Sequence, residues 1–225
     1  EALDVMRIFS KALAGCVLRY LNISDNALGE KGVRAFTELL KSQGDLEELY
    51  VMNDGISGEA AKALSELIPS TEKLKVLHFH NNMTGDEGAM PIAEMLYLSD
   101  LNLENEGTIA IVNVLKQSAP QLEVLEMAGN EITAKAAKAV AECLTAMQSL
   151  KKLTLAENEL KDDGAVTIAK SLQEGHPGLK ELDVSTNLFQ RSGARCFAQA
   201  VEILKGGKNS LEVLGPLDEN DPEGD

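Results

Sequence analysis

The sequence has no tryptophan, few aromatic residues and few cysteines. Aromatic residues make up 4% of the 225 residues and hydrophobic residues 44%, so the core must be built from aliphatic side chains. Three cysteines are too few for a disulfide framework, which favours a reducing compartment. No apolar run reaches the ~18 residues of a membrane span, and nothing near Glu1 resembles a signal peptide. We therefore expect no membrane insertion. Because the first residue is not Met, we interpret the chain as a fragment or a processed form.

Positive charge and the common catalytic motifs are also scarce. The 21 Lys and Arg residues are outnumbered by 36 Asp and Glu, a formal charge of −15, whereas a protein that binds the phosphates of nucleic acid needs a basic face. No nucleotide-binding glycine loop and no recurring Ser/His/Asp spacing is present. His78 and His80 are two residues apart and face one side of a predicted strand, but no third ligand accompanies them. We predict no metal, no cofactor and no nucleic acid, and we interpret both histidines as part of a binding surface.

One pattern recurs along most of the chain. The frame L-x-x-L-x-L-x-x-N-x-L, or a close variant of it, begins at Leu18, Leu46, Leu74, Leu122, Leu150 and Leu179. This is the leucine-rich-repeat signature. The L-x-L pair predicts a short strand with one buried face, and the apolar residues that follow at a spacing of three and four predict a helix. Stacked units of this kind form a parallel sheet on a concave side with helices outside. The predicted fold is an α/β leucine-rich-repeat solenoid of the ribonuclease-inhibitor type.

The asparagine of the frame comes where the chain leaves the strand. A carboxamide both donates and accepts, so it can satisfy backbone groups of neighbouring repeats that would otherwise be buried unpaired. Asp54 replaces it in the second repeat and Leu101 in the fourth, so we expect a weaker ladder at these two places.

The spacing of equivalent leucines shortens at one point. Leu21, Leu49 and Leu77 are 28 residues apart, but only 19 residues separate Leu77 from Leu96. We interpret this as an internal deletion near residues 95–98, where Leu96 would have to end one helix and begin the next strand. The predicted organisation is a repeat domain of about seven units over residues 1–215, followed by the start of an acidic tail at 216–225.

Equivalent positions on the strands should form rows on the concave face. The first half of one such row is rich in aromatic and hydrogen-bonding side chains, which suits contact with a protein. The predicted row consists of Asn22, Tyr50, His78, Tyr97, Glu126, Thr154 and Asp183.

Several segments are more specific than the general repeat. Residues 18–32, 46–57 and 79–88 follow one another in register, and residues 125–132, 157–164 and 217–224 add further specific segments. Together these residues closely resemble the plant Ran GTPase-activating protein family. The resemblance implies a monomeric activator of GTP hydrolysis by the GTP-bound form of Ran, which is not itself an enzyme. It also implies a cytoplasmic location, with nuclear-envelope association in the full-length family. We interpret the chain as departing from the family in three ways: it would lack the amino-terminal targeting domain, more than one repeat near 95–98 and most of the acidic tail.

The resemblance also implies a mechanism and a set of site residues. The family is understood to use no arginine of its own and to orient the catalytic Gln of the GTPase through an Asn on the third-repeat loop. That position matches Asn82, with Asn81 beside it. Asn22 stands where fungal relatives have an Arg that contacts the GTPase. The expected partner-binding residues are Arg19, Asn22, Asp25, Tyr50, Asn53, Asp54, His78 and His80.

A second function remains open at this point. The chain could be a protein-binding scaffold without activator activity, as ribonuclease inhibitors are, or a deletion form that has lost activity. Ribonuclease inhibitors share the 28- to 29-residue units, but they are rich in Cys and use Trp, unlike this chain.

Overall fold

The computed structural model describes residues 2–70, 73–82, 95–118 and 121–206. Its internal contacts divide the chain into two compact units, a first unit of Glu1–Leu101 and a second unit of Asn102–Asp225. Both alternate short strands with helices, and every strand pair given within a unit is parallel. This confirms the predicted α/β class.

In the first unit, four strands of three residues each form a parallel sheet in chain order. The central leucine of each strand pairs with the next, Leu21 with Leu49, Leu49 with Leu77 and Leu77 with Leu96, and all four are buried. The leucine spacing therefore predicted the register correctly, because only one register buries every one of these side chains. The strands are β1 (Tyr20–Asn22), β2 (Glu48–Tyr50), β3 (Val76–His78) and β4 (Met95–Tyr97).

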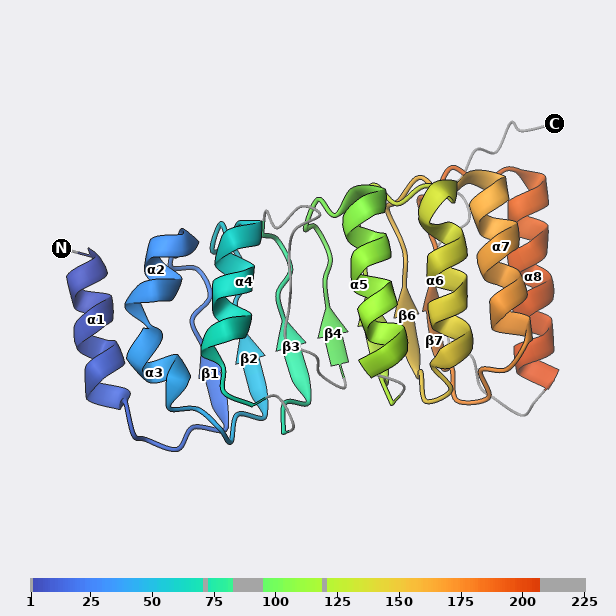
Figure 1. Cartoon of the computed structure of the whole chain (residues 1–225). Coiled ribbons are helices and arrows are strands. Elements are labelled where there is room, and N and C mark those ends of the chain that lie inside the picture. The colour runs from blue at the N-terminus through green and yellow to red at the C-terminus, as the bar shows by residue number, and fades with distance from the viewer. Residues whose placement is uncertain (1, 71–72, 83–94, 119–120, 207–225) are drawn as a thin grey trace. The chain divides into compact units, whose positions relative to one another are not determined.

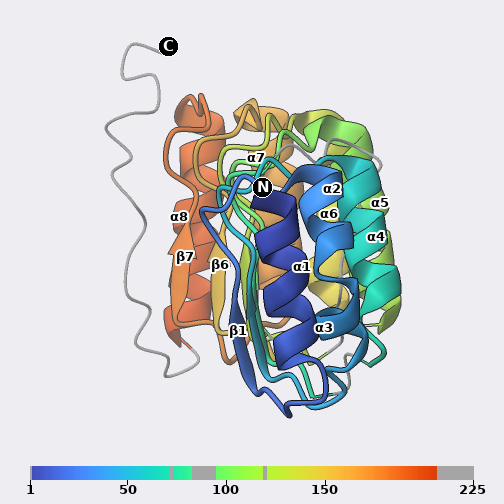
Figure 2. The same cartoon turned by 90° about the vertical axis from the view of Figure 1, so that its left-hand side faces the viewer.

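The helices of the first unit lie on one side of these strands (Figures 1 and 2). They are α1 (Ala2–Leu13), α2 (Gly29–Ala35), α3 (Thr37–Lys41) and α4 (Gly58–Leu67). The apolar spacing in each repeat predicts one helix after the strand, but in the first repeat the structure has two short helices that meet at Phe36. The ψ angle of Phe36 is 12°, away from helical geometry, and the Thr37 hydroxyl donates 2.7 Å to the Arg34 carbonyl. Gly32 within α2 is needed for packing, since a Cβ at this position would lie 2.8 Å from the Cβ of Leu28.

The second unit repeats the same plan with longer helices. In its sheet, Leu125, Leu153 and Leu182 are paired and buried. The elements are α5 (Glu104–Ser118), β5 (Val124–Glu126), α6 (Ala134–Ala146), β6 (Lys152–Thr154), α7 (Lys161–Gln173), β7 (Glu181–Asp183) and α8 (Arg191–Gly206).

Some sequence predictions fall outside the described residues. These are the helix expected to end at Leu96 and the acidic tail at 216–225. Leu96 itself lies in β4. The boundary between the units falls at Leu101, where the repeat has leucine in place of asparagine. Among the described residues, no helix combines the length and the apolar character of a membrane span.

Candidate protein-binding site

Aromatic rings stand in a line across the strands of the first unit. The register places Asn22 beside Tyr50, Tyr50 beside His78, and His78 beside Tyr97, as the sequence predicted. The ring centroids of Tyr50 and His78 are 4.6 Å apart and those of His78 and Tyr97 are 3.9 Å apart, with the rings nearly parallel in both pairs. Tyr20 adds a tilted ring 5.1 Å from Tyr50. We call these four rings the aromatic row. Stacked rings lose little freedom when a partner binds, which favours their use in protein recognition.

Two polar groups border the aromatic row. The Tyr50 hydroxyl donates to Oε2 of Glu48 at 3.0 Å, and burial together with that carboxylate raises the pKa of Tyr50 to about 12, so the phenol keeps its proton. His80 meets His78 edge-on with ring centroids 5.8 Å apart. Among the described residues, no group of three or more potential ligands is gathered for a metal ion.

Arg19 and Asn22 lie on the surface of the first unit and interact locally. The Arg19 Nε is 3.6 Å from Oε1 of Glu47, a carboxylate that also accepts from the Lys75 ammonium at 2.9 Å. The hydrogen bond from Lys75 lowers the pKa of Glu47. Asn22 accepts at Oδ1 from the backbone N–H of Ser24 at 2.9 Å. Both side chains are exposed.

Asn82 is buried and hydrogen-bonded to the backbone through both ends of its amide. We call the residues at the asparagine position of the repeats the asparagine ladder, and Asn82 belongs to it. Only 4% of Asn82 is exposed. Oδ1 accepts from the N–H groups of Asp54 and Ile56 at 3.1 Å, and Nδ2 donates to the carbonyls of Val51 and Phe79 at 2.7 and 2.8 Å. The amide is thus occupied by neighbouring turns.

Asp54 occupies the same ladder position one repeat earlier and is 1% exposed. Oδ1 accepts from the N–H of Asn26 at 2.8 Å, whereas Oδ2 is buried and accepts no hydrogen bond. Burial is the main reason why the pKa of Asp54 rises to about 6. The side chain faces the interior of the repeat rather than the surface.

The residues immediately before the ladder form an exposed row at the edge of the sheet, which we call the rim. In the first unit these are Asp25, Asn53, Asn81 and Asp100, and all four are exposed with φ between 54° and 63°. Asn and Asp tolerate this left-handed conformation better than most residues. Asn53 Nδ2 donates to Oδ1 of Asp25 at 2.8 Å, and Asn81 Nδ2 donates to Oδ1 of Asn53. Asp25, Asn53 and Asn81 were expected to bind the partner, but not to be linked to one another. The recurrence of Asp or Asn before the ladder position is the sequence signal for this link.

The second unit has different residues at the same positions. Its rim consists of Gly129, Glu157 and Thr186, again with positive φ. On its strands Lys152 lies 2.8 Å from Oε1 of Glu126 and 3.4 Å from Oε2 of Glu181, so ion pairs replace the aromatic row.

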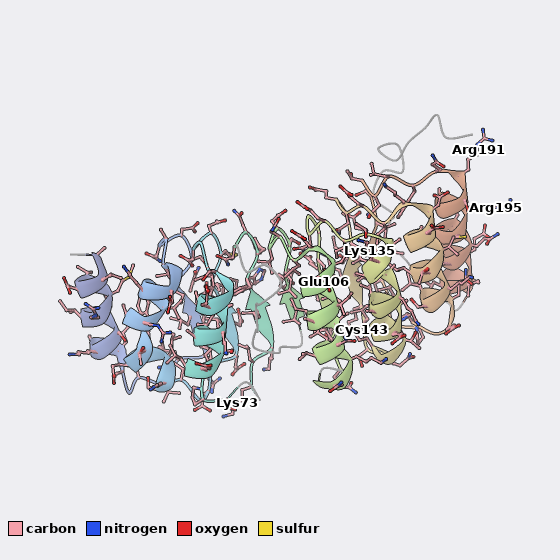
Figure 3. All side chains as sticks on the ribbon, turned by 45° about the horizontal axis from the view of Figure 1, so that its top comes forward. Lys73, Glu106, Lys135, Cys143, Arg191 and Arg195 are labelled. Carbon is pink, nitrogen blue, oxygen red and sulfur yellow. The ribbon has the colours of Figure 1, made fainter. Side chains whose placement is uncertain are left out.

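The three cysteines differ in burial: Cys16 is exposed, Cys196 is partly exposed and Cys143 is buried. Cys143 lies on α6, and burial raises the pKa of its thiol to about 12, so it is not a thiolate near neutral pH (Figure 3). Arg191 and Arg195 project outward from the start of α8 (Figure 3).

The chain is similar to known proteins that contain leucine-rich repeats. The leucine-rich-repeat family model matches residues 16–36, 119–141 and 146–169. The "RAN GTPase-activating protein 2" of Arabidopsis thaliana is 48% identical over 312 residues, which cover the whole chain and 57% of that relative. The chain therefore spans little more than half of its length.

Two further relatives extend the comparison. The "RAN GTPase-activating protein 1" of Arabidopsis thaliana is 71% identical over 52 residues, 23% of the chain and 10% of the relative. The mouse "Ribonuclease inhibitor" is 32% identical over 194 residues, 86% of the chain and 38% of the relative. The predicted ribonuclease-inhibitor type of repeat is thereby confirmed.

Proposed function

Since the chain is a homologue of the plant RAN GTPase-activating proteins in its leucine-rich-repeat region, we propose that it activates GTP hydrolysis by the GTPase Ran. The observation that carries the proposal is 48% identity along the entire chain. In this role the chain has no substrate of its own and completes the active site of the GTP-bound partner. We propose that it does so as a monomer in the cytoplasm.

We assign the residue that orients the catalytic Gln of Ran to Asn81 rather than to Asn82. The Asn82 amide is buried and uses both ends on the backbone, whereas Asn81 lies on the exposed rim. GTP hydrolysis needs a positioned water, and a carboxamide that holds the Gln of the GTPase in place contributes through orientation alone. A contact of this kind requires an exposed side chain.

The partner-binding surface extends from the rim over the concave face of the first unit. Asp25, Asn53 and Asn81 provide the rim, and Tyr50, His78 and His80 provide rings beside it. Arg19 and Asn22 lie at the first-repeat end of this surface. Asp54 supports the loop from inside the repeat instead of touching the partner.

We propose that the chain supplies no arginine to the active site of Ran. Of its five arginines, Arg7, Arg19 and Arg34 each lie within 4 Å of a carboxylate. Arg191 and Arg195 are on α8 in the second unit, whereas the proposed rim belongs to the first unit.

The proposal is tested by single-turnover hydrolysis of GTP on Ran with and without the full chain. We expect acceleration by the chain and none with a Ran variant that lacks its catalytic Gln. If the chain binds GTP-loaded Ran but does not accelerate hydrolysis, the activator role is wrong.

A binding scaffold is the second candidate function. The 32% identity to a ribonuclease inhibitor over 86% of the chain favours it. The same assay separates the two functions, because a scaffold would bind a protein partner and leave the rate of GTP hydrolysis unchanged.

A further inference from the structure

Three side chains on the rim of the first unit form a continuous line of hydrogen bonds. Asp25 accepts from Asn53 at 2.8 Å, and Asn53 accepts from Asn81. The three residues come from consecutive repeats, 28 positions apart, and all three are exposed. The line therefore runs along the rim and ends at the residue that we assign to the Gln of Ran.

The chemistry of the first member sets the direction of the whole line. An ionised carboxylate can only accept hydrogen bonds, so the amide of Asn53 must turn its N–H groups toward Asp25. Its carbonyl oxygen then faces Asn81, which must donate an N–H to it. As a result, Asn81 Oδ1 points away from Asn53 and stays available as an acceptor. If Asp25 were neutral, either orientation of the Asn53 amide would be possible.

The backbone holds these side chains in place. The N–H of Asp25 donates to the carbonyl of Met52 at 2.9 Å, and that of Asn81 donates to the carbonyl of Ser99 at 3.0 Å. Asp25, Asn53 and Asn81 share φ angles of 63°, 55° and 56°. Each Cβ therefore leaves the chain in nearly the same direction, which brings neighbouring amides into contact.

We propose that Asp25 and Asn53 are positioning residues that fix the Asn81 amide with its carbonyl oxygen toward the partner. In that orientation Asn81 Oδ1 accepts an N–H of the catalytic Gln, and the Gln oxygen is left to hold the attacking water. The inference rests on the proposed function and adds two residues to it that do not themselves touch the reacting atoms.

The second unit offers a built-in control. Its rim residues Gly129, Glu157 and Thr186 include no amide, so no such line can form there. Glu157 has the same left-handed backbone, and its N–H donates to the carbonyl of Ser185 at 3.0 Å. Glu157→Gln therefore changes the charge at an equivalent rim position without affecting the proposed line.

The test measures both the hydrolysis rate at saturating activator and the activator concentration that gives half the maximal rate. A hydrogen bond to a charged group corresponds to roughly a tenfold effect. We expect Asp25→Asn and Asn53→Ala each to lower the saturating rate by about 10-fold, a loss that persists however much activator is added and so is separate from any change in the half-saturating concentration. Glu157→Gln should change neither quantity.

A swap of the charge along the line makes the test independent of folding. In Asp25→Asn combined with Asn53→Asp, the amide at position 25 donates to the carboxylate at position 53, which still accepts from Asn81. We expect this double variant to restore the saturating rate to within about 2-fold of wild type. A residue that merely supports the loop would not be rescued by moving the charge.

Several results would overturn the inference. If Asp25→Asn and Asn53→Ala both activate like wild type, the line has no role in positioning. If they raise the half-saturating concentration and leave the saturating rate unchanged, the two residues contribute to affinity alone and do not position Asn81. If the double variant is no better than Asp25→Asn alone, the polarity argument is wrong. If wild type itself does not accelerate hydrolysis, the proposed function fails and the inference falls with it.

Discussion

The two units are built from the same repeat but differ on the face that the strands expose. In the first unit the strands present stacked rings, and in the second unit Lys152 is paired with Glu126 and Glu181. The buried leucines are alike in both units, so the core does not determine this difference. The repeat therefore leaves the exposed strand positions and the rim free to vary. We place the proposed function where those positions are rings and amides rather than ion pairs.

The asparagine ladder has more complete hydrogen bonding at Asn158 in the second unit than at Asp54 in the first. In the second unit Asn158 accepts from the N–H groups of Asn130 and Ile132 at 3.1 and 3.0 Å and donates to the carbonyls of Met127 and Leu155 at 3.0 Å. In the first unit Asp54 stands at such a position with one buried oxygen that accepts no hydrogen bond. The first unit thus has the weaker ladder beside the proposed binding surface.

The largest expected effect comes from removing a complete ladder amide. Asn158→Ala leaves several buried backbone groups without partners and should lower the free energy of unfolding by about 3 kcal/mol. The matched control is Asn26→Ala, because Asn26 is an exposed ladder residue and donates to the local carbonyls of Ile23 and Ser24. That change should cost about 1 kcal/mol. Urea denaturation of both variants checks the difference, and equal losses would contradict the ladder as described.

Asp54→Asn should raise the free energy of unfolding near neutral pH. The folded pKa of about 6 lies above the ordinary value of 3.8, so folding favours the protonated acid. This stabilisation is complete below about pH 4 and is lost as the pH rises through about 6. An amide needs no proton and can donate to carbonyls as Asn82 does. We expect a gain of about 2 kcal/mol at pH 7 that shrinks toward pH 4, measured by urea denaturation at both values.

A gain from Asp54→Asn that did not depend on pH would contradict this explanation.

His176 in the second unit should contribute the opposite pH dependence of stability. Burial lowers the pKa of His176 below 6.5, so the folded state favours the neutral ring, and its contribution is lost as the pH falls below 6.5.

The sequence predicted the strands and rows correctly because leucines at fixed spacing leave only one register that buries them all. It did not predict the break between α2 and α3 at Phe36. A helical pattern of apolar residues does not show that the Thr37 hydroxyl donates a hydrogen bond to the Arg34 carbonyl. It matched the Gln-orienting position to Asn82, with Asn81 beside it, whereas we propose Asn81. Adjacent residues differ in direction by local backbone geometry, and the positive φ of Asn81 directs its side chain to the rim.

Tyr50→Ala should weaken binding of GTP-loaded Ran by about 10-fold, or about 1.4 kcal/mol. The variant removes the ring between Tyr20 and His78 and so interrupts the aromatic row. Thr154 occupies the matching row position in the second unit, and Thr154→Ala should change the affinity by less than about 2-fold. Isothermal titration measures both affinities; equal losses would show that the two faces do not differ in binding.

The smallest effect is expected from arginine. Arg191→Ala combined with Arg195→Ala should change the saturating hydrolysis rate by less than about 2-fold, whereas loss of an arginine finger costs roughly a thousandfold or more. Single-turnover hydrolysis decides between these values. A large loss would move the active residues to the second unit.

The most direct test of the central claim compares one rim residue from each unit in the same single-turnover assay on Ran. Asn81→Ala in the first unit should lower the saturating hydrolysis rate by about 100-fold, as expected when a group that positions the reacting atoms is removed. Glu157→Ala in the second unit should leave the rate within about 2-fold of wild type. Equal activation by both variants, or a loss with Glu157→Ala instead, would contradict the assignment of the Gln-orienting residue to Asn81.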